Sequence, residues 1–157
     1  MSKEEALREI AEAKETGATE LDLSWCELNE LPPELFQLTN LTALSLSDNQ
    51  LHKLPETIGQ LKNLSALVLT GNQISKLPVE ITQLNDLTFL FLDNNPLTSP
   101  PPEIAEQGIE AIREYFSGVQ HSKIPLNEIK VLLVGDGAAG KTSLVKKLIG
   151  EPFDEHE

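Results

Sequence analysis

The sequence contains few of the residues that mark several common protein classes. Its single cysteine cannot form an internal disulfide, and aromatic residues make up only 4% of the 157 residues. No run approaches the roughly 20 apolar residues that are needed to span a membrane. The chain starts with Met-Ser-Lys-Glu-Glu, which is charged where a signal peptide would be apolar. These absences predict a cytoplasmic protein whose core is built from Leu, Ile, Val and Ala.

Basic residues are also scarce. The chain has 12 Lys and Arg against 25 Asp and Glu, a formal net charge of −13, and residues 1–120 alone carry −12. Such a surface repels phosphate, so we do not expect a nucleic-acid partner. His52, His121 and His156 are spaced too widely for a metal-ligand motif, and we expect them on the solvated surface.

What the sequence does contain is a repeat of 23 residues. Leucines recur at this interval, each followed two residues later by a second leucine, and asparagines recur in the same register. The first set of leucines is Leu21, Leu44, Leu67 and Leu90, the second is Leu23, Leu46, Leu69 and Leu92, and the asparagines are Asn49, Asn72 and Asn95. A fixed period of this length predicts a solenoid. The pattern resembles the leucine-rich repeat, L-x-x-L-x-L-x-x-N-x-L, in four copies over residues 18–101.

Each residue type in the repeat has a physical role. The alternating leucines predict short strands with one buried face, which stack into a parallel sheet. These strands are expected near residues 20–23, 43–46, 66–69 and 89–92. The asparagine amides should satisfy backbone groups that are buried at the turns. The Leu-Pro pairs predict an extended or turned return path rather than a full helix. The expected fold class is an α/β leucine-rich-repeat solenoid with a helical cap at each end.

The N-terminal end departs from the repeat. Ser2 and Glu5 form a capping-box pattern ahead of a predicted helix over residues 3–15, inside a capping segment of residues 1–17. Apolar residues gather on one face of this helix: Ala6, Leu7, Ile10 and Ala11. Cys26 takes the position of the first asparagine. Because no repeat precedes it to receive an amide, we predict that Cys26 is a small buried hydrophobe.

The C-terminal end of the array is expected to close in a similar way. Ile109, Ile112 and Phe116 are spaced by three and four residues and predict a second capping helix within residues 102–120. From residue 117 to 128 the chain is polar and has no period. We therefore assign residues 121–128 to a linker.

A different pattern begins at residue 129. The apolar run Ile-Lys-Val-Leu-Leu-Val is typical of a strand buried in a parallel sheet. It leads into Gly-Asp-Gly-Ala-Ala-Gly-Lys-Thr, which matches the phosphate-loop pattern G-x-x-x-x-G-K-[ST] in full. Backbone N–H groups of such a loop face a phosphate at the start of a helix. We expect Lys141 to reach the β- and γ-phosphates and the Thr142 hydroxyl to ligate Mg²⁺. The candidate nucleotide-binding residues are Gly135, Asp136, Gly137, Ala138, Ala139, Gly140, Lys141, Thr142 and Ser143.

The order of these parts resembles the Roco family, in which leucine-rich repeats precede a Ras-like GTPase domain called Roc. The strings Asn-Pro-Leu-Thr-Ser-Pro-Pro-Pro-Glu-Ile and Gly-Ile-Glu-Ala-Ile-Arg-Glu-Tyr-Phe belong to the same resemblance. It implies that residues 129–157 are the start of a Roc domain. It also implies that GTP or GDP and Mg²⁺ bind the complete parent protein.

Several parts of a GTPase are missing from the sequence. The 16 residues after Lys141 contain neither the Asp-x-x-Gly of the γ-phosphate side nor the Asn-Lys-x-Asp that reads guanine. We therefore expect the chain to be part of a longer protein, to need no cofactor by itself and to hydrolyse no GTP. Two alternatives stay open. One is a minimal nucleotide-binding or hydrolysing protein that acts through this loop, and the other is an unrelated repeat scaffold with an accidental phosphate loop.

A binding surface is predicted on the concave face of the repeats. Residues that alternate with the buried leucines must point out of that face. They run from acidic at the N-terminal edge to apolar at the C-terminal edge. The candidate partner contacts are Trp25, Val68, Phe89 and Phe91. They would be covered either by an external protein or by the GTPase domain of the same polypeptide, and no membrane contact is expected.

Overall fold

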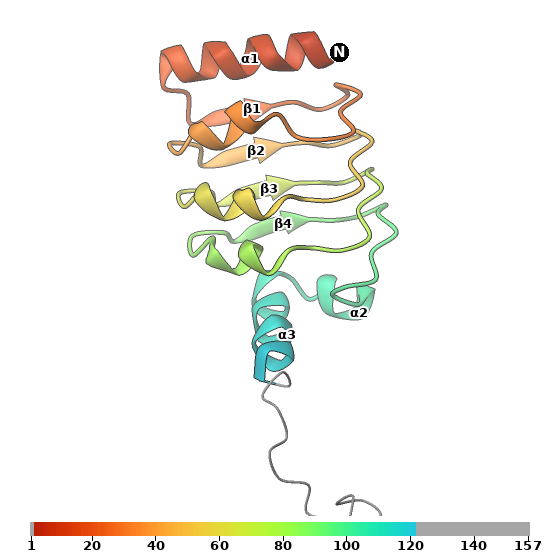
Figure 1. Ribbon diagram of the computed structural model, residues 1–157. Helices are drawn as coiled ribbons and strands as arrows, with labels where there is room; N and C mark the ends of the chain where they lie inside the picture. The colour runs from red at the N-terminus through yellow and green to blue at the C-terminus, as the bar shows by residue number, and fades with distance from the viewer. Residues whose placement is uncertain (1, 122–157) are drawn as a thin grey trace, which may run out of the picture. The chain divides into compact units, whose positions relative to one another are not determined.

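The computed structural model describes residues 2–121, which form a stack of four short strands with helices at both ends (Figure 1). Three further elements, named η1 to η3 in the text, are 3₁₀ helices. The elements are α1 (Lys3–Thr16), β1 (Glu20–Asp22), η1 (Pro33–Gln37), β2 (Ala43–Ser45), η2 (Glu56–Gln60), β3 (Ala66–Val68), η3 (Val79–Gln83), β4 (Phe89–Phe91), α2 (Pro102–Ala105) and α3 (Ile109–His121). Almost all of the predicted linker and the whole phosphate-loop segment lie outside the described residues.

The strands form one parallel sheet in the order β1-β2-β3-β4, which confirms the predicted pairing. Leu21 lies opposite Leu44, Leu44 opposite Leu67, and Leu67 opposite Leu90. One repeat therefore advances the chain by one strand, as the 23-residue period predicts. Each strand ends one residue earlier than expected, because the second leucine of each pair already belongs to the turn.

The repeat leucines form the core of the array. In the middle repeats, Leu46, Leu67 and Leu69 are fully buried. Burial of one such side chain contributes about 2 kcal/mol to stability. In the last repeat, Leu90 and Leu92 are only partly buried. The repeat leucines are therefore more completely buried at the centre of the stack than beside β4. Within the described residues, β4 has a neighbouring strand on only one side.

Each return path begins at a proline. Pro32, Pro55 and Pro78 have an extended backbone, and each is followed by a five-residue 3₁₀ helix. The fixed φ of proline favours this extended entry and stops a helix from continuing through it. Each 3₁₀ helix turns an apolar residue into the core: Leu35, Ile58 and Ile81. The predicted turned return path is thus built as a short helix.

The repeat asparagines connect successive turns. Asn49 Nδ2 donates to the carbonyl oxygens of Leu23 (2.9 Å) and Leu46 (3.0 Å). Its Oδ1 accepts from the backbone N–H groups of Cys26 (3.1 Å) and Leu28 (3.0 Å). In the next two repeats, the asparagines again reach back 26 residues to a leucine carbonyl. The predicted role of these amides is therefore confirmed.

The same geometry explains why Cys26 replaces asparagine. In the later repeats the amide donates to a leucine carbonyl of the preceding repeat, whereas the element before β1 is a helix. Helix α1 packs against β1 and η1 in place of a repeat. Cys26 is 0% exposed, and its thiol donates to the carbonyl oxygen of Ser24 at 3.6 Å. Burial raises the pKa of the thiol above its ordinary value. The prediction of a buried, hydrophobic role is confirmed.

Helix α1 begins at the predicted capping box. The Ser2 hydroxyl accepts from the Glu5 N–H (3.3 Å), and the Glu5 carboxylate accepts from the Ser2 N–H (2.6 Å). The buried residues of the helix are Ala6, Ile10 and Ala13. Leu7 and Ala11 were expected on this face, but both are exposed. The prediction was wrong for them because the buried stripe is narrow and uses only the i, i+4 and i+7 positions.

Two helices, rather than one, close the other end. Helices α2 and α3 are separated at Gly108, whose φ of 95° is rare for other residues. In α3, Ile109, Ile112 and Phe116 are buried, as their spacing predicts. The helix continues to His121, whereas the polar, aperiodic segment was expected to begin at residue 117. Apolar spacing stops at Phe116, but the backbone hydrogen bonds of a helix need no apolar face.

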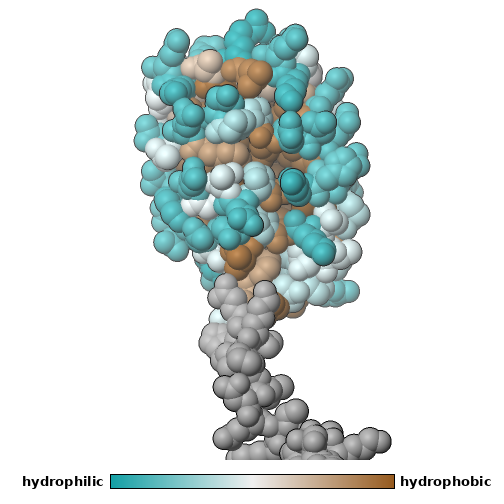
Figure 2. Space-filling model, viewed as in Figure 1, coloured by the Kyte–Doolittle hydropathy of each residue, from teal (hydrophilic) through white to brown (hydrophobic). Residues whose placement is uncertain are grey.

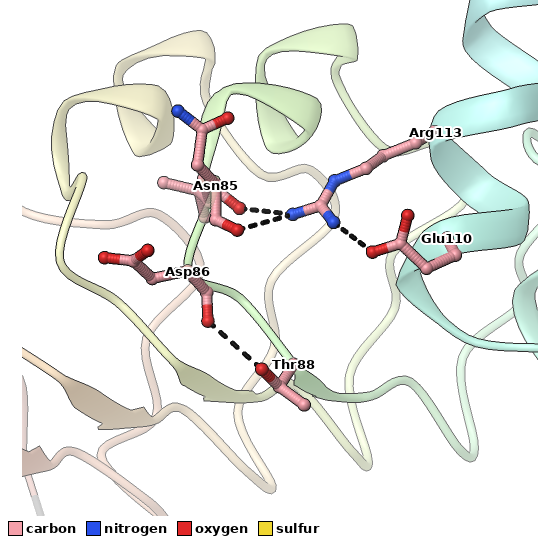
Figure 3. A network of polar contacts seen from close by, with 6 residues as sticks. Asn85, Asp86, Thr88, Glu110 and Arg113 are labelled. Atoms are coloured by element: carbon pink, nitrogen blue, oxygen red, sulfur yellow. Dashed lines mark hydrogen bonds and ion pairs between the residues drawn. The ribbon is translucent and has the colours of Figure 1, made fainter.

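The Arg113 side chain connects α3 to the last return path through hydrogen bonds (Figure 3). Arg113 Nη2 donates to the carbonyl oxygens of Leu84 (2.6 Å) and Asn85 (3.3 Å), just after η3. Its Nη1 donates to the Glu110 carboxylate on the same helix. The Leu84 carbonyl also accepts from the Leu87 N–H (3.2 Å), so the guanidinium adds a second donor there and anchors the cap.

Candidate interaction surface

Alternate strand residues point away from the leucine core and make one face of the sheet, which we term the open face. In register they form two columns across the four strands. The first column is Glu20, Ala43, Ala66 and Phe89, and the second is Asp22, Ser45, Val68 and Phe91. Each column thus begins with a carboxylate on β1 and ends with an aromatic ring on β4.

The apolar end of the open face is exposed to water. Phe89 is 58% exposed and Phe91 is 47% exposed, while Val68 beside them is partly buried. The structure therefore places these three predicted contacts together, on β3 and β4. Because each Phe residue is about half exposed, complete burial of both side chains would contribute about 1 kcal/mol for each. This part of the sheet therefore presents apolar surface that another protein surface could bury.

The acidic end is exposed and ordered by hydrogen bonds. The Asp22 carboxylate accepts from the backbone N–H (2.9 Å) and the hydroxyl (2.5 Å) of Ser24. The Ser24 hydroxyl also lies 2.8 Å from that of Ser45 on the next strand. Within residues 2–121, neither Glu20 nor Asp22 takes part in an ion pair. Within these residues, Ser24 donates hydrogen bonds to Asp22, but no cationic side chain lies within ion-pair distance of either carboxylate.

The middle of the open face is a shallow depression, because the side chains there are small. Over β1 to β3 there is a shallow depression of about 350 Å³, whose walls include Ala43, Ala66 and Val68. A second hollow of about 420 Å³ lies beside β4 and α2. Figure 2 shows a largely hydrophilic surface with hydrophobic residues visible between the polar ones along the stack. Apolar surface is thus accessible at several levels of the array.

Trp25 lies in the turn after β1 and not in a strand. Its side chain is 66% exposed, and its φ of 61° is left-handed. The equivalent positions of the next three repeats are also left-handed, and they hold Asp48, Gly71 and Asn94. Those residue types tolerate this backbone conformation, whereas a bulky side chain is unusual there. The chain therefore keeps an exposed indole at a position that disfavours it.

We expect Trp25→Asn to stabilise the fold by about 1 kcal/mol relative to Trp25→Ala, because asparagine tolerates the left-handed backbone and alanine does not. Both variants remove the indole, so lost contacts cancel in the comparison. Urea denaturation followed by circular dichroism gives the two free energies of unfolding. Equal values would show that the backbone at this turn is not strained.

Two other kinds of feature are absent from residues 2–121. In that range no group of three or more His, Cys, Asp or Glu side chains is placed to hold a metal ion. No helix there has both the length and the apolar character to cross a membrane. The predicted nucleotide-binding residues, 135–143, lie outside the part of the chain that the structure describes.

Comparisons with known proteins agree on the repeat region. Residues 21–107 match the family described as leucine-rich repeat region. No curated protein sequence matches the chain. A leucine-rich repeat protein of Leptospira interrogans is 37% identical, with a TM-score of 0.43, over 56% of this chain and 29% of its own. The leucine-rich repeat domain of the type III effector XopL is 28% identical, with a TM-score of 0.51, over 60% of this chain and 33% of its own. The chain thus spans about a third or less of either structure.

Proposed function

Because the chain belongs to the leucine-rich repeat family, we propose that it is a protein-interaction module that binds through the open face. The observation that carries this proposal is the exposure of Phe89 and Phe91 side by side on β4. Adjoining exposed aromatic side chains usually mark an interface. Repeat arrays present such surfaces because each strand adds one more row of side chains.

The proposal extends to the protein of which this module is a part. The phosphate-loop sequence after the repeats supports a Roco-type, cytoplasmic GTP-binding signalling protein, with the repeats as its N-terminal part. In that protein, residues 135–143 would hold the phosphates of GTP or GDP, and Thr142 would ligate Mg²⁺. The open face would then contact either an external protein or the GTPase domain itself.

The binding proposal is tested by Phe89→Ser combined with Phe91→Ser. We expect the double variant to keep its fold, within about 1 kcal/mol, because neither ring is part of the leucine core. It should lose the proteins that the wild-type chain captures from a cell extract. The matched control is Leu7→Ser with Val119→Ser, which removes two exposed apolar side chains (39% and 37% exposed) outside the open face. Control and wild type should capture the same proteins.

Three outcomes of this test are informative. Loss of capture by this chain favours an external partner, whereas an effect seen only in a complete GTPase favours an internal contact. Equal capture by both double variants would contradict the open face as the binding surface. Unfolding of the Phe variant would show that the two rings support the repeat core after all.

The nucleotide part of the proposal has its own test. With GTP added, we expect no turnover above the no-protein control, because the switch and guanine-reading sequences do not occur in this chain. Lys141→Ala should leave the thermal unfolding of the repeats unchanged. Hydrolysis that this substitution abolishes would instead favour a minimal nucleotide hydrolase. Phosphate release and a thermal scan of both proteins provide the measurements.

A further inference from the structure

The open face lacks positive charge of its own. Residues 2–121 contain seven Lys and Arg residues, and none of them is at an open-face position. The nearest candidates in sequence are on helix α1 and on the return paths. Glu20 and Asp22 therefore have no internal cation within this part of the chain, although Asp22 is held in place by Ser24. A basic group from outside residues 2–121 would complement this end of the open face.

The arrangement of the columns limits the shape of that partner. From β1 to β4 there are three strand spacings of about 4.8 Å, so about 14 Å separates the carboxylates from the phenyl rings. An extended chain covers this distance in about four residues. The two columns are two residues apart along each strand, or about 7 Å, so one extended segment that crosses the strands can contact both columns. The small side chains of Ala43 and Ala66 leave room for a backbone between the two ends.

We propose that the open face binds an extended segment of a partner protein that carries a basic residue about four residues away from a large apolar residue. The basic side chain pairs with Glu20 and Asp22, and the apolar side chain packs on Phe89 and Phe91. Small residues of the segment cross the hollow between them. This inference rests on the proposed function and adds the chemistry of the partner.

The two ends make different contributions to binding. The carboxylates attract a cation over a distance and fix the direction of the segment across the strands. The phenyl rings exclude water from the apolar contact and supply most of the affinity. An arginine is better suited than a lysine, because its planar guanidinium can meet a carboxylate with two parallel hydrogen bonds. Trp25, in the turn after β1, gives a fluorescent reporter at the acidic end.

Synthetic peptides test the proposal directly. The probe is acetyl-Arg-Arg-Ser-Gly-Ser-Phe-Leu-amide. A charge-reversed peptide has Glu in place of both Arg, and a rearranged peptide, Ser-Gly-Ser-Arg-Arg-Phe-Leu, places the charges beside the apolar residues. At low ionic strength we expect the probe to bind about tenfold tighter than either, as two exposed ion pairs allow. Raised salt should remove most of this preference.

Two double variants separate local from overall charge. Glu20→Gln with Asp22→Asn should reduce probe affinity about tenfold and remove the preference over the charge-reversed peptide. Glu34→Gln with Glu56→Gln removes the same charge from exposed residues of η1 and η2, and it should change affinity less than about twofold. Phe89→Ser with Phe91→Ser should weaken all three peptides.

The results distinguish failure of this inference from failure of the proposed function. If the charge-reversed peptide binds as tightly as the probe, or if the two charge variants weaken binding equally, the basic–apolar partner is wrong. An apolar interface then still stands, provided that the Phe variant loses peptide binding. If no peptide binds, an extended segment of this kind is not the occupant, and the capture experiment alone decides the function of the face.

Discussion

Asn72→Ala should lower the free energy of unfolding by about 3 kcal/mol. The side chain is only 5% exposed, and its Oδ1 accepts from the Leu51 N–H at 3.1 Å. Its Nδ2 donates to the carbonyl oxygens of Leu46 and Leu69, both at 2.9 Å. Alanine would leave the buried Leu51 N–H without an acceptor, which costs about 1–3 kcal/mol, and would remove one donor from each carbonyl.

The position of Asn72 in the middle of the stack increases the expected loss of stability. Asn72 joins the second and third repeats, and a solenoid is stabilised largely by the contacts between neighbouring repeats. The two carbonyls keep a second amide donor from the adjacent repeats, which sets an upper limit to the loss. Replacement in the middle of the array therefore weakens both halves at once.

Asn63→Ala is the matched control. The Asn63 amide donates to the Thr39 carbonyl at 2.9 Å, but this bond is exposed to solvent, so its loss should cost less than about 1 kcal/mol. Urea denaturation of the two variants and the wild type gives the comparison. If both variants are destabilised equally, the repeat asparagines do not hold successive turns together as their geometry indicates.

The periodic part of the fold could be predicted because every repeat meets the same neighbours. The spacing of Leu21, Leu44 and Leu67 determines both the strands and their register. The same argument assigns the asparagine amides to the turns. The period also explains why residue 26 is a cysteine and not an asparagine. The asparagine amide bonds to the preceding repeat, and the first strand is preceded by a helix instead.

The two capping segments could not be predicted with the same accuracy, because neither sequence recurs in the array and no repeated pattern reveals its neighbours. The exposure of Leu7 depends on how closely α1 approaches β1, which no spacing in its own sequence reveals. The break at Gly108 divides a segment that was assigned to one cap. The extension of α3 beyond Phe116 adds no buried apolar residue among 117–119, which are exposed, so the apolar spacing does not reveal it.

The open face was predictable in part from alternation along the strands. Phe89 and Phe91 are exposed at the strand positions where the pattern placed them. The backbone at Trp25 was missed, but a signal was present. At the 23-residue interval it aligns with Asp48, Gly71 and Asn94, which are residue types that tolerate a left-handed turn.

Ile112→Ala should loosen the C-terminal end of the array while its centre stays folded. Ile112 is 0% exposed, and truncation of a buried isoleucine costs about 2–5 kcal/mol. Helix α3 packs against η3 and is held there by Arg113. Because each repeat contacts only its neighbours, the loss is concentrated in the last repeat and its cap.

Hydrogen exchange can locate this effect. The Phe89 N–H, which donates to the Ser65 carbonyl at 3.0 Å, should lose about a hundredfold of its protection. The Leu46 N–H, which donates to the Val68 carbonyl in the middle of the sheet, should change by less than about threefold. Val119→Ala, at an exposed position of the same helix, is the control and should change neither. An equal loss of protection at both amides would mean that the array unfolds as one cooperative unit, and that α3 stabilises every repeat rather than only the one it covers.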